Sequence, residues 1–463
     1  MMESQGHPLG IHRTTAEPRS QLTSLLRFAV VVYVFGMLVV LVEQGTLFFS
    51  NLAPVDFWNI LFIPVCWLYL IRTHQVVRFP FALGMWFILL GSLIGTFAAF
   101  NPLASMIVIA KELYLYVWFV TLAAVFAGLE SGLLRRALLL WVAVVVLHGA
   151  LLIAELVSPS FYAVMLSTLG KIGAVDVRYI GRPAGVFQDP VWAALFQLMG
   201  IVPLLLAGLR RTWTMLLGTV LLLSILATAS LGALTSLAGA SAVGMLVYLL
   251  SGGRTKFFGW LAAVLTLAVA LVFFTNLLAP DVLVRLEQLT LGRAAHTLGE
   301  RLHLWQGGTE VVLSPDSILG VGPDNYRDFQ ENKTLHNDAL EFIVERGVIG
   351  LLGLALLAIE AVNSAVKILW KQIKSRDMAV PSGVIFLAML VGLLLESNAH
   401  QIFHFRVVWV ALALLEATLF RMTAESTEAP AAMPSELENQ QPPAPARSSH
   451  RRRRRSPTSA DAG

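Results

Sequence analysis

The chain has 463 residues, of which 57% are hydrophobic and only 13% are charged, and its mean hydropathy is +0.73. In soluble domains about a quarter of all residues are charged, so this composition excludes an ordinary soluble globular protein. The formal net charge of +4 comes mostly from C-terminal arginines and short loops and says little about a substrate. We expect an all-α, polytopic membrane protein.

Apolar segments recur along most of the chain at the length that a transmembrane helix needs. About 17 to 25 mostly apolar residues cross roughly 30 Å of hydrocarbon as a helix. The most apolar cores predict twelve transmembrane helices, at residues 28–42, 57–71, 80–100, 103–128, 137–156, 191–209, 213–229, 234–250, 257–278, 348–368, 380–395 and 407–420.

Basic residues between these segments set the expected orientation. Alternate threading through a bilayer places the following residues on one side: Arg72, Arg78, Arg135, Arg136, Arg210, Arg211, Arg254, Lys256, Lys371, Lys374, Arg376 and Arg421. By the positive-inside rule that side is the cytoplasm. Residues 1–27 then form a cytoplasmic N-terminal segment without a signal-peptide cleavage site, and residues 28–421 form the transmembrane domain. Both termini lie inside, while two long loops, at about residues 157–190 and 280–347, face outward.

The C-terminal residues 422–463 are rich in Pro, Ala, Ser and Glu and contain five consecutive arginines at 451–455. Such a composition cannot bury a core, so the sequence predicts a disordered, basic cytoplasmic tail. The arginines can touch anionic membrane lipids, or the tail can be solvated without any partner. Nothing near it indicates nucleic-acid binding.

The first outer loop carries Arg178 and Arg182 shortly before a predicted span. Arginines at the outer mouth of a span run against the positive-inside bias, because a guanidinium near lipid needs an anionic partner. A diphosphate, which accepts paired hydrogen bonds, suits them. The alternative is that they pair with Asp176 and Asp189 of the same loop.

The second outer loop is acidic, with eleven carboxylates against six cations between residues 280 and 347. Any anion site there must therefore come from a few placed arginines, and Arg293 and Arg301 are candidates. Arg301 and Trp305 are four residues apart, a spacing that places them on one face of a helix. Gly320 and Gly322 predict a tight turn.

Beyond that turn, Thr334 is a plausible N-cap for the next helix, which puts His336 in its first turn. There the positive end of the helix dipole disfavours the charged imidazole, so a neutral ring can accept a proton. At helical spacing His336 points into the bundle, whereas Asp338, Glu341 and Glu345 point to water. The alternative for His336 is a capping or packing residue.

The run Arg182-Pro-Ala-Gly185-Val-Phe187-Gln-Asp189-Pro190 and the later order Arg301, Trp305, Gly320-Val-Gly322, His336-Asn337 and Glu345-Arg-Gly347-Val-Ile-Gly350 form one pattern. This pattern resembles the signature of the O-antigen ligase and Wzy-type polymerase superfamily, over about residues 180–360. One departure is plain. Many members carry Ser-Arg after the seventh span, whereas here Ser230 is followed by Leu231-Gly232.

The resemblance implies an inverting, metal-independent glycosyltransferase without a cofactor, acting at the periplasmic face of a bacterial inner membrane. Its donor is an undecaprenyl-diphosphate-linked glycan, and its acceptor is a lipid or another glycan. Arg182 and Arg301 are expected to stabilise the departing diphosphate, with Arg178 and Arg293 as further binding residues. His336 is the expected general base.

The sequence leaves the roles of several polar and aromatic residues open. Asn337 can orient the base and Trp305 can stack on a sugar ring, although packing alone also explains the tryptophan. Polar residues at the outer turn between the last two spans can flank the same cavity, although a structural role suits them better: Glu396, His400, His404 and Arg406.

The resemblance does not choose among a ligase acting on lipid A-core, a polymerase of O-antigen or exopolysaccharide, and an oligosaccharyltransferase acting on protein. A transporter or flippase of lipid-linked glycans is the rival class. Such folds tend to contain repeated halves with matching broken helices, and the sequence contains no convincing internal repeat.

The predicted orientation is tested by cysteine labelling of intact cells with a membrane-impermeant reagent. Single cysteines at Asn332 and Ala174, in the two outer loops, should be labelled from outside. Cysteines at Ser251 and Ser375, beside cytoplasmic basic residues, should be protected until the membrane is permeabilised. Labelling of position 375 in intact cells would overturn the orientation.

Overall fold

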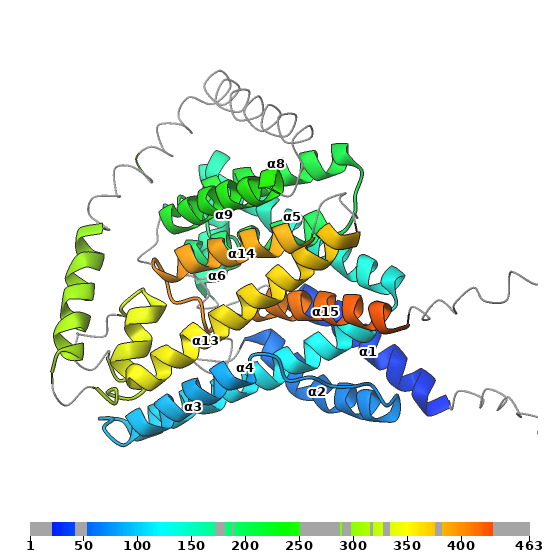
Figure 1. The fold of residues 1–463 in the computed structure, drawn as a ribbon. Coiled ribbons are helices and arrows are strands. Elements are labelled where there is room, and N and C mark those ends of the chain that lie inside the picture. Colours follow the sequence, from blue (N-terminus) through cyan, green and yellow to red (C-terminus); the bar gives the residue numbers. More distant parts are fainter. Residues whose placement is uncertain are drawn as a thin grey trace, which may run out of the picture. The chain divides into compact units, whose positions relative to one another are not determined.

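The computed structural model describes residues 21–41, 53–171, 181–187, 189–250, 288, 298–314, 318–326, 334–375 and 382–428. Within these residues the protein is helical and contains no strand (Figure 1). The N-terminal segment 1–20 and the tail beyond residue 428 lie outside them, so the prediction of a disordered basic tail stays untested there.

The helices follow one another along the chain in the order α1 (Gln21–Val40), α2 (Pro54–Arg72), α3 (Ala82–Thr96), α4 (Pro102–Gly128), α5 (Ser131–Val157), α6 (Pro159–Lys171), α7 (Pro190–Leu206), α8 (Arg211–Ala227), α9 (Leu231–Leu250), α13 (Asp338–Ser375), α14 (Ser382–Ser397) and α15 (Arg406–Glu428). Residues 298–312 are also helical.

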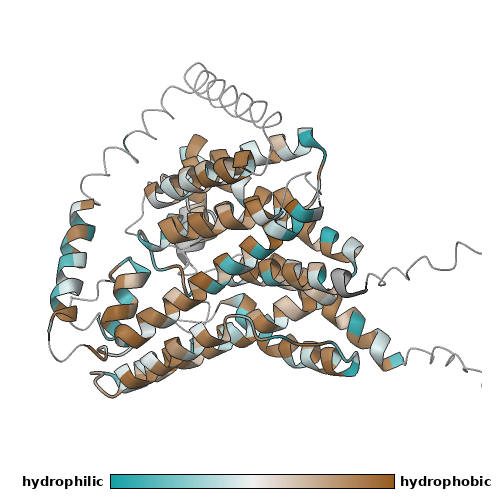
Figure 2. Ribbon diagram, in the orientation of Figure 1, coloured by the Kyte–Doolittle hydropathy of each residue, from teal (hydrophilic) through white to brown (hydrophobic). Residues whose placement is uncertain are grey.

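Seven of the described helices are long and apolar enough to cross a membrane: α1, α2, α4, α5, α9, α13 and α15. Four shorter apolar helices, α3, α7, α8 and α14, occupy other predicted cores. Apolar residues dominate these helices, and hydrophilic residues gather toward helix ends and connections (Figure 2). The predicted all-α, polytopic fold is therefore confirmed. The predicted span at residues 257–278 lies outside the described residues.

Local sequence explains where two of the helices begin. Asn101 accepts a hydrogen bond from the backbone N–H of Ala104 at 3.1 Å, and Pro102 occupies the first helical position of α4. Asp189 accepts from the N–H of Val191 at 2.8 Å, and Pro190 starts α7 in the same way. A polar cap followed by proline is a strong signal for a helix start, since proline lacks the N–H that the first turn leaves unbonded.

Helices α3 and α13 pack along each other (Figure 1). Glycines allow the two backbones to approach: a Cβ atom at Gly91 would lie 2.6 Å from the backbone nitrogen of Gly350, and one at Gly84 would lie 2.8 Å from that of Leu357. Small residues at such a crossing are typical of helices that associate within a membrane. The crossing sets the position of α13, on which the predicted base depends.

A buried ion pair ties α2 to α15. The Nε of Arg406 donates to Oδ1 of Asp56 at 2.8 Å, and Tyr114 of α4 donates to the same oxygen at 2.9 Å. Asp56 and Arg406 are both almost fully buried. Charges removed from water require such partners, so this cluster explains Arg406 as a structural residue.

Helix α14 lies against α9 and also contacts α13. In Figure 1 the orange α14 runs beside the green α9, and the yellow α13 follows on its other side. The turn after α14 therefore lies where the start of α13 can meet it. That meeting point contains most of the predicted site.

Replacing Gly91 by alanine should destabilise the protein, because the added methyl group meets backbone rather than a movable side chain. We expect a loss of about 1–3 kcal/mol, measured as thermal unfolding in detergent. Gly218→Ala in α8 is the matched control, because its Cβ would meet only the side chain of Leu204, at 3.8 Å. The control should be neutral or more stable by up to about 1 kcal/mol. Equal stability of both variants would contradict the close packing.

Candidate active site

The segment before α13 carries His336 and Asn337. Asn337 is the N-cap, since its Oδ1 accepts from the N–H of Leu340 at 2.9 Å. His336 has φ +51°, in the left-handed region, so it precedes the helix. The prediction that Thr334 caps the helix and that His336 lies in its first turn is therefore wrong. Thr334 instead places its Oγ1 3.3 Å from Nε2 of His336.

The acids at the start of α13 are buried, so the prediction that they point to water is wrong as well. Asp338, Glu341 and Glu345 are 4%, 7% and 4% exposed. Asp338 accepts from the backbone N–H of Ile402 at 3.1 Å, and Glu341 accepts from the side chain of Gln401. The turn between α14 and α15 thus covers Asp338 and Glu341, and Glu345 is bonded to Arg346.

The G-x-G turn packs against the same helix. The N–H of Val321 donates to the carbonyl of Val344 at 3.0 Å, and that of Gly322 donates to the carbonyl of Glu345 at 2.9 Å. Gly347, with φ +65° and ψ −169°, interrupts α13 at this point and frees those carbonyls from helical bonding. A Cβ atom at Gly320 would lie 2.4 Å from the Glu345 oxygen. The two glycine motifs therefore form one backbone junction.

Arg301 lies on the helical residues 298–312 and reaches the turn after α14. Its Nη2 is 2.9 Å from Nε2 of His400. The other ring nitrogen of His400, Nδ1, lies 2.8 Å from Oε1 of Glu396. The ring of His336 meets that of His400 edge to face, with centroids 6.0 Å apart. The predicted base and one predicted arginine thus converge on a histidine between them.

Two predicted substrate-binding residues hold the backbone of this site. The indole N–H of Trp305 donates to the carbonyl of Leu335 at 3.1 Å, directly before His336. The side-chain nitrogen of Asn337 lies 3.4 Å from Oδ1 of Asn398, at the end of α14. Both interactions position the segment that carries His336.

Arg182 lies on a short connection whose backbone is held from α5. Glu155, a buried carboxylate, accepts from the N–H groups of Ala184 and Gly185, each at 3.0 Å. The Nε of Arg182 donates to the carbonyl of Thr228 at 3.0 Å, at the end of α8. Arg182 is therefore anchored to the junction between α8 and α9.

The α8–α9 junction also reaches His400. A Cβ atom at Gly232, in the first turn of α9, would lie 2.9 Å from Oε1 of Glu396 and 3.1 Å from Cε1 of His400. Arg182 thus contacts this junction directly, and Arg301 is connected to it through His400. Two other predicted arginines, Arg178 and Arg293, lie outside the described residues.

A second group of buried charges lies behind the start of α13. Arg346 donates to Oε1 of Glu112 on α4, at 2.6 and 3.0 Å, and to Glu345 at 3.2 Å. The side chains of Glu112 and Arg346 are both fully buried. Nε2 of His404 lies 3.5 Å from the same Glu112 oxygen. Burial lowers the pKa of His404 to about 4, so Arg346 is the cation that neutralises Glu112.

A polar cavity of about 100 Å³ opens beside this group, and its lining includes Thr334, Glu341, Glu345 and His404. Thr334 links the cavity to His336. Its volume allows a few water molecules, roughly 30 Å³ each in the liquid.

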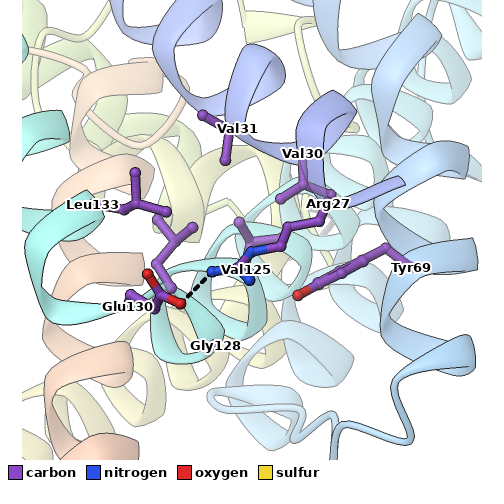
Figure 3. A pocket seen from close by; sticks show the side chains of 9 residues that line it. Arg27, Val30, Val31, Tyr69, Val125, Gly128, Glu130 and Leu133 are labelled. Atoms are coloured by element: carbon purple, nitrogen blue, oxygen red, sulfur yellow. Dashed lines mark hydrogen bonds and ion pairs between the residues drawn. The ribbon is translucent and has the colours of Figure 1, made fainter. Parts of the chain in front are cut away.

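A larger cavity, of about 200 Å³, lies between α1, the end of α4 and the start of α5 (Figure 3). Its charged residues are Arg27 and Glu130, which bond each other across it. The rest of its lining is mostly aliphatic, with the ring of Tyr69 on one side. It contains none of the predicted site residues.

The sequence analysis named Glu396 and His400 as residues that can flank the cavity, but it missed two features of the site: the pairing of Glu396 with His400 and that of Glu112 with Arg346. The four-residue spacing of Glu396 and His400 on one helix end was a usable signal for the first. For the second, 234 residues separate the partners, and no local pattern joins them. Among the described residues, no group of three or more His, Cys, Asp or Glu side chains is arranged to hold a metal ion.

Replacing Arg346 by methionine should leave the buried Glu112 without its arginine, at a cost of about 3–5 kcal/mol in the free energy of unfolding. Thermal unfolding in detergent measures the loss, and the double variant Glu112→Gln/Arg346→Met should recover part of it. Arg27→Met is the matched control. Its partner Glu130 is 68% exposed, so the control should lose less than about 1 kcal/mol. Similar losses in both single variants would refute a special role for the buried pair.

Comparison with known families gives an independent result. Residues 216–355 match the family model described as O-antigen ligase. No curated protein matches the chain. The matched segment contains Arg301, Trp305, the G-x-G turn and His336-Asn337, which carry half of the sequence pattern. The resemblance drawn from these motifs is thus confirmed by a match to the O-antigen ligase family over residues 216–355 of a chain rich in apolar helices.

Proposed function

We propose that this protein transfers a glycan from an undecaprenyl-diphosphate donor to the hydroxyl group of an acceptor, at the periplasmic face of a bacterial inner membrane. The observation that carries the proposal is that His336 and Arg301, both in the segment that matches the O-antigen ligase family, converge on His400. A histidine beside an anchored guanidinium provides both groups that such a transfer needs.

In the proposed reaction, the acceptor hydroxyl oxygen attacks the anomeric carbon of the donor sugar from the face opposite the diphosphate. The new C–O bond forms as the bond to the diphosphate oxygen breaks, so the anomeric configuration inverts. His336 takes the hydroxyl proton on its imidazole. The lipid diphosphate leaves with the electron pair of the broken bond, and no metal ion is required.

The arginines stabilise the departing diphosphate. Negative charge grows on its bridging oxygen during departure, and a fixed guanidinium close to a low-dielectric region stabilises it by a few kcal/mol. Arg301 and Arg182 are held by His400 and by the carbonyl of Thr228, so little reorganisation is needed during the reaction. Arg178 and Arg293 are proposed as further diphosphate ligands.

Trp305 and Asn337 are proposed to contact the saccharide as well as the backbone near His336. Trp305 is partly exposed and its indole N–H is bonded to the carbonyl of Leu335, so an aromatic side chain lies beside the segment that carries His336. Asn337 caps α13 through its oxygen and points its nitrogen toward Asn398.

A ligase role is favoured by the description of the matching family. A polymerase of the same superfamily uses the same donor chemistry with a glycan acceptor. The surface glycan of a deletion strain separates them: unattached polymer indicates a ligase, and single attached repeat units indicate a polymerase. A normal glycan profile, together with uptake of lipid-linked glycan by vesicles containing the purified protein, would instead indicate a transporter.

Replacing His336 by alanine or asparagine should reduce transfer by about 10² to 10⁴-fold, as expected for loss of a general base. Asparagine tolerates the left-handed backbone that His336 adopts, so this variant separates chemistry from strain. Turnover and thermal stability are measured on the same purified protein with lipid-linked donor. Donor binding should be largely retained, because arginines hold the diphosphate.

His303→Ala is the matched control for His336, because this histidine is exposed on the helical residues 298–312. It should transfer normally. If His336→Asn also transfers normally per folded molecule while its unfolding temperature falls, His336 only packs and the catalytic role is wrong.

A further inference from the structure

Four side chains form one hydrogen-bonded series behind the proposed active site. Nη2 of Arg301 is 2.9 Å from Nε2 of His400, and Nδ1 of His400 is 2.8 Å from Oε1 of Glu396. The hydroxyl of Ser236, on α9, donates to the second oxygen of Glu396 at 3.0 Å. The series joins three separate parts of the chain: the helical residues 298–312, the end of α14 and the start of α9.

The chemistry of the donors decides which nitrogen of His400 carries the proton. A guanidinium has N–H groups only and cannot accept a hydrogen bond, so Nε2 of His400 must accept from Arg301. The proton of a neutral imidazole then lies on Nδ1, from which it donates to the Glu396 carboxylate. In this arrangement the ring of His400 accepts a hydrogen bond from Arg301 and donates one to Glu396, so it connects the guanidinium to the carboxylate.

Burial keeps this series in place. Glu396 is fully buried and His400 is 9% exposed, so both rely on partners within the protein. The first turn of α9 approaches them at Gly232, where no side chain intervenes. The absence of a side chain at this glycine provides room for the carboxylate and the ring.

We propose that Glu396 and His400 are a positioning pair for Arg301, which they hold in the orientation that meets the departing diphosphate. This inference rests on the proposed function, in which Arg301 stabilises that diphosphate. His400 touches neither substrate in this assignment. It acts through the guanidinium, in the way that a carboxylate behind a histidine fixes the orientation of a metal ligand or a catalytic base.

His400 is a poor candidate for the base itself. Its Nε2 lone pair already accepts from Arg301, and its Nδ1 proton is already donated to Glu396. A proton taken from an acceptor would have to displace the guanidinium and would place two cations side by side. The hydrogen bond between His336 and Thr334 is of another kind, because a hydroxyl can turn to donate or to accept.

Two substitutions of His400 separate its two contacts. In His400→Gln the amide oxygen reaches the position of Nε2 and can still accept from Arg301. In His400→Asn the amide nitrogen reaches the position of Nδ1 and keeps only the contact with Glu396. Positioning predicts that the glutamine variant stays within a few-fold of native transfer, while the asparagine variant loses about 10- to 100-fold in kcat/KM, as misplacement of a group by about 1 Å can cause. The reverse order, or equal activity of the two variants, would overturn the inference.

A double-substitution cycle gives a second readout that survives an unstable single variant. Arg301→Lys should lower transfer by itself, because an ammonium lacks the fork of the guanidinium. If His400 acts only through Arg301, adding His400→Asn to Arg301→Lys should cause little further loss of transfer. The two single variants should then change kcat and KM in the same proportion as each other. Independent, multiplicative losses would show that His400 has another role.

The cycle also distinguishes the failure of the inference from that of the proposed function. Normal transfer by Arg301→Lys would remove the proposed role of Arg301 and, with it, the reason for a positioning pair. A large loss in Arg301→Lys with native activity in His400→Asn would leave the proposed function intact and refute only the positioning role.

Discussion

The buried ion pair between Glu112 and Arg346 is the constraint on which the rest of the site depends. Both side chains are removed from water, and an isolated charge there would cost several kcal/mol, so the two helices must meet at this register. Arg346 immediately precedes Gly347, where α13 breaks and the G-x-G turn bonds to its carbonyls. The pair therefore fixes the short helical stretch that begins beside His336, and it does so from α4, outside the matched family segment.

From this fixed point the site is assembled by backbone contacts more than by side-chain chemistry. Asp338 and Glu341 hold the turn between α14 and α15, which brings His400 beside His336. Trp305 holds the carbonyl of Leu335, which ties the helical residues 298–312 to the same place. Loops that are far apart in the sequence thus converge, and the groups proposed to react lie at their contact rather than on any single rigid helix.

Hydropathy and motif order were enough to predict the fold class, most helix positions and the superfamily, because membrane spans and proline starts are local signals. The register at α13 was mispredicted for a physical reason. The prediction from periodicity assumed that carboxylates face water, whereas Glu345 accepts a hydrogen bond from Arg346 and Asp338 accepts one from a backbone N–H. His336 was placed in a helix because nothing in a single sequence reveals a left-handed residue other than glycine. A local sequence pattern cannot reveal the pairing of Glu112 with Arg346, because 234 residues separate the two.

The burial of these acids also resolves an apparent conflict in charge. Eleven carboxylates and six cations in residues 280–347 would repel a diphosphate if all faced one cavity. Asp338 and Glu345 instead bond to a backbone N–H and to Arg346, so part of the negative charge is matched inside the protein. Glu396 lies outside this segment and reaches Arg301 through His400, whose ring contacts both the guanidinium and the carboxylate. In this arrangement the buried carboxylate orients the guanidinium through the imidazole ring.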